Sequence, residues 1–101
     1  LTAPANLDTT LAVKVYAKSN NKLVALTGLA KEDFLLKVDG VTVTITTLTA
    51  GSVDGEYTLT VPAFATGEII TLQLFDSVLN ASIINLDGSL YKSNVATKPV
   101  V

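Results

Sequence analysis

The chain has 101 residues, of which 49% are hydrophobic and 16% are charged, and its formal net charge is -2. This length suits one domain that buries roughly two-thirds of the surface its unfolded chain exposes. Cysteine and histidine are absent, which excludes disulfides, thiolate metal sites and histidine-based catalysis. The few lysines are spread along the chain, so we expect no nucleic-acid binding. No apolar run approaches the roughly 20 residues of a membrane span, so we expect no membrane insertion.

Both ends of the chain have the composition of linkers. Pro4 interrupts a stretch of small residues at the start, and Lys98-Pro99 follows the last candidate strand. We therefore predict an N-terminal linker over residues 1–9, one domain over 10–96 and a C-terminal linker over 97–101. Such ends are typical of a module that belongs to a longer chain.

Alternating apolar and polar residues predict a first strand from Leu11 to Ala17, which ends at the turn formers Ser19-Asn20-Asn21. A second strand is predicted over Lys22–Thr27 and stops at Gly28. Residues 29–33 are the one place where a helical turn is plausible.

The clearest element is a hairpin around Asp39-Gly40. This pair suits a two-residue type I′ turn because both positions require a positive φ. The matching register puts three apolar pairs on one face: Val38 with Val41, Leu36 with Val43 and Phe34 with Ile45. Leu35, Lys37, Thr42 and Thr44 are left on the opposite face.

The second half of the chain continues the two-residue period. Tyr57, Leu59 and Val61 are predicted on the inner face of one strand, and Ile70, Leu72 and Leu74 on that of the next. Phe64, in the connection between them, is expected to fold inward because a leucine-sized or larger side chain left in water forfeits roughly 1.5–3 kcal/mol. A second Asp-Gly pair, at Asp87-Gly88, predicts a hairpin between residues 82–86 and 89–93 with a weaker register. The whole pattern predicts an all-β, immunoglobulin-like antiparallel β-sandwich of about seven strands.

The run Asp54-Gly55-Glu56-Tyr57-Thr58-Leu59 resembles the tyrosine corner of immunoglobulin-like domains. The resemblance implies that Tyr57 buries its ring and returns its hydroxyl to upstream backbone. The alternative is an ordinary strand tyrosine at the start of a half-buried run.

A broader resemblance covers residues 13 to 74 and rests on turn and core positions. These include Leu26-Thr27-Gly28-Leu29, Glu32-Asp33-Phe34, Val38-Asp39-Gly40-Val41, Tyr57-Thr58-Leu59 and Ala65-Thr66-Gly67. In this order they resemble the immunoglobulin-like repeats of bacterial and archaeal surface proteins, adhesins and secreted hydrolases. The resemblance implies a spacer, stalk or adhesion module, and it transfers no binding residue.

The polar residues leave three kinds of chemistry to weigh. The carboxylates at positions 32, 33, 39, 54, 56, 76 and 87 could form an acid-base pair, but each sits where turn geometry already favours it. Calcium binding is a better functional interpretation of these carboxylates than catalysis, although no Asp-x-Asp-x-Asp run is present. A sugar platform would need Tyr16, Phe75 and Tyr91, which lie on separate strands. Asn80-Ala81-Ser82 is a possible N-glycosylation site.

We therefore expect a non-catalytic structural spacer or interaction module of a larger cell-surface or secreted protein, without a cofactor. Its expected partners are neighbouring modules of the same or another surface protein. The alternatives are a carbohydrate-binding or adhesion module, with a glycan as partner, and an accessory domain of a secreted hydrolase. Tyr57, Phe34, Asp39 and Gly40 are the expected structural residues. Leu35, Ile69 and Phe75 are the candidate interaction surface.

Overall fold

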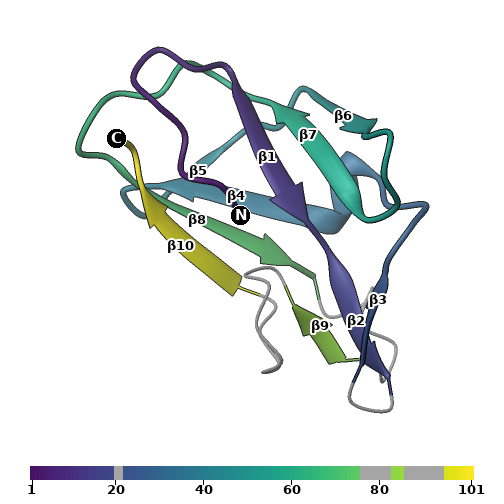
Figure 1. Ribbon diagram of the computed structural model, residues 1–101. Helices are drawn as coiled ribbons and strands as arrows, with labels where there is room; N and C mark the ends of the chain where they lie inside the picture. The colour runs from purple at the N-terminus through teal and green to yellow at the C-terminus, as the bar shows by residue number, and fades with distance from the viewer. Residues whose placement is uncertain (20–21, 76–82, 86–94) are drawn as a thin grey trace.

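The structure is a computed structural model that describes residues 1–19, 22–75, 83–85 and 95–101. In this part of the chain the regular structure is almost entirely β, and two antiparallel sheets face each other across a shared core (Figure 1). The predicted all-β, antiparallel architecture is therefore confirmed.

Seven of the described strands form the two main sheets. The three-stranded sheet has the order β1 (Thr10–Lys14), β7 (Glu56–Thr60), β6 (Thr47–Ala50). The four-stranded sheet has the order β10 (Val95–Pro99), β8 (Ile69–Leu74), β4 (Phe34–Val38), β5 (Val41–Val43). A small third sheet, β3 (Lys22–Ala25), β2 (Tyr16–Ser19), β9 (Ile83–Asn85), extends from one end of the body (Figure 1).

The core contains the residues that the two-residue period placed inward. Its buried members are Leu11, Val13, Val15, Phe34, Leu36, Ile45, Tyr57, Leu59, Val61, Phe64, Ile70, Leu72, Leu74, Ala96 and Val100. Phe64 is 2% exposed although it lies in a loop, which confirms its inward position. The helical turn expected at residues 29–33 is present as a short 3-10 helix, η1 (Lys31–Asp33).

The hairpin around Asp39-Gly40 has the predicted turn and the first part of the predicted register. Asp39 and Gly40 have φ values of 50° and 82°, and Val38 pairs with Val41 and Leu36 with Val43. The third predicted pair, Phe34 with Ile45, is wrong as a strand pair. β5 ends at Val43, before Ile45, and the Thr46 N–H bonds the Thr60 carbonyl in the other sheet, so Phe34 has a strand partner only on the β8 side, where it pairs with Leu74. Ile45 is buried in the same core at the point where the chain crosses between the sheets.

The strand predicted over residues 11–17 is divided at Val15. β1 belongs to the three-stranded sheet and β2 to the small one, and Val15 between them belongs to neither strand. Its N–H donates to the Gly55 carbonyl at 2.8 Å, and its carbonyl accepts the Leu26 N–H at 3.0 Å. Gly55 has a φ of 86°, and a Cβ there would lie 3.0 Å from both the Val15 carbonyl oxygen and the Ala25 Cβ. The sheets meet at a corner that only glycine fits.

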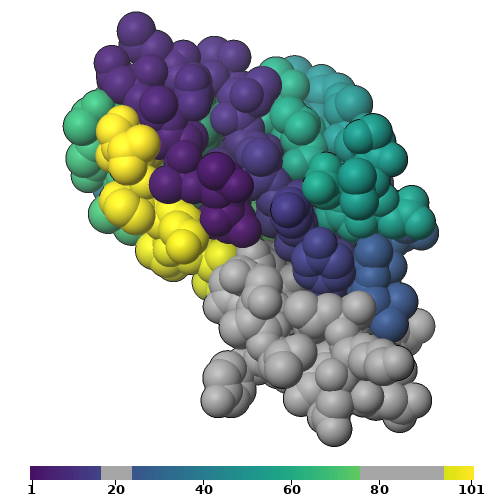
Figure 2. Space-filling view, viewed as in Figure 1, coloured from purple at the N-terminus to yellow at the C-terminus, as the bar shows by residue number. Residues whose placement is uncertain are grey.

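The two predicted linkers are instead packed parts of the domain. Pro4 is buried, the Thr2 N–H donates to the Ala12 carbonyl at 3.0 Å, and the Leu7 N–H donates to the Phe64 carbonyl at 2.8 Å. At the other end β10 pairs with β8 through Pro99, which a strand at the edge of a sheet tolerates because its outer side needs no N–H. Figure 2 shows the N-terminal segment against the C-terminal strand, where the Val101 N–H donates to the Pro4 carbonyl at 2.9 Å. Proline content alone was a misleading signal for a linker.

Candidate functional site

Tyr57 ties the segment after β3 to the three-stranded sheet. Its side chain is 4% exposed, its ring lies 6.4 Å from that of Phe34 in a tilted arrangement, and its hydroxyl donates to the Leu26 carbonyl at 2.7 Å. The Leu29 N–H donates to the same hydroxyl at 3.4 Å. The predicted bond from the hydroxyl to upstream backbone is present, but its acceptor lies 31 residues earlier, whereas a tyrosine corner reaches back only a few.

Asp39 closes the β4–β5 turn onto the start of β8. Its N–H donates to the Ile69 carbonyl at 2.8 Å, and its carboxylate Oδ1 accepts the Ile69 N–H at 2.9 Å. The aspartate thus fits the positive φ of the turn and joins two strands at once.

Three other carboxylates also accept backbone N–H groups, each within a turn. Asp8 accepts the Ala5 N–H at 2.9 Å, Asp33 accepts the Ala30 N–H at 2.8 Å, and Glu68 accepts the Ala65 N–H at 2.6 Å. Each bond spans three residues, which is the reach of an acidic side chain that caps a tight turn. These three carboxylates bond to backbone N–H groups of their own turns, and they do not face a common site.

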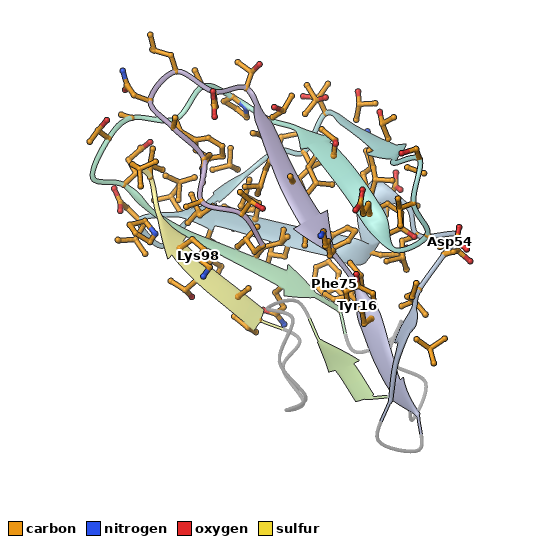
Figure 3. All side chains as sticks on the ribbon, in the orientation of Figure 1. Tyr16, Asp54, Phe75 and Lys98 are labelled. Atoms are coloured by element: carbon orange, nitrogen blue, oxygen red, sulfur yellow. The ribbon has the colours of Figure 1, made fainter. Side chains whose placement is uncertain are left out.

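Among the other described charged side chains, the Lys31 ammonium donates to the Thr46 carbonyl at 3.1 Å, and one loose ion pair is present. Lys14 on β1 and Glu56 on β7 approach to 3.8 Å between Nζ and Oε1, with both side chains exposed to water. They line a shallow pocket of about 130 Å³ together with Thr2, Ala12, Val13, Gly51, Tyr57 and Thr58. Asp54 lies on the loop that joins β6 to β7, far from Lys98 on β10 (Figure 3).

The three residues of the candidate interaction surface share one face but not one patch. Leu35, Ile69 and Phe75 all point away from the core of the four-stranded sheet, with Leu35 half-buried, Ile69 44% exposed and Phe75 37% exposed. The pair Lys37 and Thr71 lies between Leu35 and Ile69. The structure therefore separates Ile69 from the other two.

A second pocket, which we call the end pocket, is one that sequence reasoning missed. It has a volume of about 180 Å³ and is lined by Val38, Val43, Pro62, Ala63, Phe64 and Glu68. Val38 and Val43 face the core but stay half-buried, because the sandwich is open at this end. The period of the strands marks both valines as inward, but it carries no information on what closes the end of the sandwich.

Leu7, beside this pocket, is the other residue that the sequence did not single out. It is 73% exposed and has a φ of 70°, a value that leucine rarely adopts. Nothing in the local sequence signals it, because glycine or asparagine is the expected residue at such a position.

Several predicted positions fall outside the described residues. These are Asp76, Asn80 to Ser82, Asp87-Gly88 and Tyr91. The acid-base, glycosylation, hairpin and aromatic predictions made for them stay predictions. Of the second hairpin only β9 is described, and it pairs with β2.

Within the described ranges, no three acidic side chains are close enough to hold a metal ion, and no helix is long and apolar enough to cross a membrane. Searches for similar proteins found no matching protein family, curated protein or solved structure.

Proposed function

We propose that this domain is a non-catalytic, immunoglobulin-like structural module of a larger cell-surface or secreted protein. Strand order supports the immunoglobulin-like part of the proposal. An immunoglobulin sandwich places its second, fifth and fourth strands side by side in one sheet, and its seventh, sixth and third in the other, with an extra strand beside the third in variable-type domains. The orders β1-β7-β6 and β10-β8-β4-β5 follow that arrangement, with the strands taken in the same sequence along the chain.

The observation that carries the structural role is how the carboxylates are used. Asp8, Asp33 and Glu68 each accept a backbone N–H within a turn, and Asp39 accepts the Ile69 N–H at the start of β8. A catalytic acid and base must instead face a common substrate site. These four acidic side chains instead stabilise turns and a strand start of the sandwich, which supports a structural role.

The direction of the chain supports a place between other modules. Asn6 donates to the Val101 carbonyl at 3.2 Å while Val101 donates to the Pro4 carbonyl, which is the pattern of parallel strands. The chain therefore runs in the same direction where it enters and where it leaves. A module attached before residue 1 and one attached after residue 101 would therefore extend in opposite directions from the domain.

A replacement experiment in the parent protein tests the spacer role. The domain is exchanged for an unrelated β-sandwich of similar length, and in a second variant it is deleted. A spacer predicts that the exchange preserves the activity or adhesion of the parent, whereas the deletion impairs it. Loss of function in both variants would contradict the proposal, since a spacer contributes length and stiffness rather than a specific surface.

Binding and turnover assays on the isolated domain test the alternatives. We expect no binding in a titration against a panel of glycans and no hydrolysis of common polysaccharides. Saturable binding of one glycan, lost on changing Tyr16 or Phe75 to Ala, would replace the spacer role with that of a carbohydrate-binding module.

A further inference from the structure

We propose that Asp54-Gly55, in the turn before β7, is a site where the chain isomerises spontaneously to isoaspartate, and that the fold protects Asp39-Gly40 from the same reaction. The inference does not depend on the spacer role. Both pairs follow a valine, so Val38-Asp39-Gly40 and Val53-Asp54-Gly55 are the same tripeptide. A difference in their reactivity therefore reports on the structure around each pair.

The reaction needs only the two residues of the pair and water. The backbone nitrogen of the glycine attacks the Cγ carbon of the protonated aspartate, a C–N bond forms, and the carboxyl hydroxyl leaves as water with the amide proton. Glycine favours this attack because it has no side chain to block the approach. Water then opens the five-membered succinimide ring at either carbonyl carbon, which restores aspartate or leaves isoaspartate. One water is released and one is taken up, so the connectivity of the main chain changes while its mass does not.

The Asp54 side chain is free to take part in this reaction. It is exposed on the loop between β6 and β7, and Figure 3 shows it at the periphery of the molecule. Within the described part of the chain its carboxylate makes no hydrogen bond or ion pair. The Glu56 N–H closes the turn by donating to the Val53 carbonyl at 3.1 Å, so closure does not use the Gly55 N–H. The carboxyl can therefore turn toward the Gly55 nitrogen without breaking a bond of the fold.

Asp39 has the same neighbours in the tripeptide but a different environment. Its Oδ1 accepts the Ile69 N–H at 2.9 Å, and its own N–H donates to the Ile69 carbonyl at 2.8 Å. To reach the Gly40 nitrogen, its Cγ has to turn away from Ile69 and give up the first of these bonds. A hydrogen bond to a charged acceptor is worth about a factor of ten or more in an equilibrium. We therefore expect Asp39 to react more slowly than Asp54 by about that factor.

Isomerisation at Asp54 would act on the corner between the sheets. Isoaspartate routes the main chain through the side-chain carbon, so it inserts one extra carbon directly before Gly55. The Gly55 carbonyl accepts the Val15 N–H at 2.8 Å, and Gly55 is so close to Val15 and Ala25 that a Cβ has no room. A longer main chain at this point has to displace Gly55 from those contacts. The modified protein should therefore lose the bond that holds Val15 where β1 gives way to β2.

Ageing of the intact domain in solution tests the inference. The purified protein is kept at mildly acidic pH and physiological temperature, and samples are then unfolded and cleaved after glutamate. This cleavage releases residues 33–56, a peptide that contains Asp39 and Asp54 but not Asp87. Electron-transfer fragmentation in a mass spectrometer distinguishes isoaspartate from aspartate and locates it. We expect isoaspartate to accumulate at position 54 about tenfold or more faster than at position 39.

Two controls separate the effect of the fold from that of the local sequence. In urea the two sites should isomerise at similar rates, because their tripeptides are identical. Asp54→Asn and Asp39→Asn form a matched pair of variants, in which the same ring closes with loss of ammonia and water then opens it. The mass gain of this deamidation is followed on the whole protein. Asp39→Asn keeps an acceptor for the Ile69 N–H, so we expect the Asp54→Asn protein to deamidate faster.

The effect on the corner has a readout of its own. Asp54→Glu is the control, because its longer side chain would have to close a larger ring and reacts far more slowly. We expect the aged wild-type protein to contain a fraction that melts at a lower temperature than the fresh protein. In that fraction the Val15 amide hydrogen, which the Gly55 carbonyl accepts, should exchange faster with solvent in nuclear magnetic resonance spectra. The aged Asp54→Glu protein should show neither change.

Three results would overturn the inference. The first is a folded domain in which Asp54 forms isoaspartate no faster than Asp39. The second is the same preference for Asp54 in urea, since the local sequence and not the fold would then be its cause. The third is a protein modified at Asp54 that melts like the fresh one and keeps its slow Val15 exchange, which would refute the effect on the corner.

Discussion

The hydroxyl of Tyr57 offers the sharpest test of what holds the sandwich together. Tyr57→Phe keeps the buried ring and its contact with Phe34 but removes the donor to the Leu26 carbonyl at 2.7 Å and the acceptor for the Leu29 N–H at 3.4 Å. The first bond is short and well made, and the second is long and contributes little. Leaving a partly buried carbonyl without its donor costs about 1–2 kcal/mol, since water replaces only part of the lost bond.

That cost is a large fraction of a domain stability of roughly 5–15 kcal/mol. The assay is urea unfolding followed by far-ultraviolet circular dichroism, with a thermal melt beside it. We expect the urea midpoint to fall without a change in slope and the melting temperature to fall by about 4–8 °C for each kcal/mol lost. Tyr16→Phe, at a half-buried tyrosine on β2, is the matched control. A Tyr57→Phe protein with the midpoint of the wild type would refute the reasoning, because the hydroxyl would then contribute nothing that water cannot replace.

Four further predictions follow from the same structure. Phe34→Ala removes a buried ring of the core and should destabilise the domain by about 3–5 kcal/mol in urea unfolding, and a loss below 1 kcal/mol would mean that the site collapses freely. Asp39→Ala should lower stability by about 1–2 kcal/mol, whereas Asp39→Asn, which keeps an acceptor for the Ile69 N–H and tolerates the positive φ, should stay close to wild type. Leu7→Asn should stabilise the domain by about 0.5–1 kcal/mol, because it relieves the left-handed strain, and a lower melting temperature would contradict this. Added calcium should leave the melting temperature unchanged, and a clear rise would reveal a site for it, since a ligand that binds only the folded state stabilises it.

Local rules predicted those parts of the fold that depend on one strand and its nearest turn. The Asp39-Gly40 pair set the turn and the first two pairs of its hairpin, since two positive φ values leave few other conformations. Strict alternation likewise identified Ile70, Leu72 and Leu74 as inward residues, and all three are fully buried. In each case the information lies within about ten residues of the chain.

The rest depends on contacts between distant segments. At Ile45 the chain crosses from one sheet to the other, and the bond from Thr46 to Thr60 fixes this crossing. Residues 1–8 are held against the domain by bonds to Ala12, Phe64 and Val101. Neither contact has a local sequence signal. The same holds for the candidate site: the strain at Leu7 exists only because Phe64 and the Ala5–Asp8 turn impose it, so composition and period could not reveal it.

Gly55 is the glycine of this chain that evolution can least easily replace among those described below. Gly28, Gly40 and Gly67 have open space where a Cβ would stand, so asparagine could replace them during evolution at modest cost. At Gly55 any side chain would press on the Val15 carbonyl and on Ala25, besides having to adopt a φ of 86°. A library of all single substitutions should therefore show position 55 as nearly invariant among the folded variants. A distant relative that carries another residue there would need a different corner between its sheets.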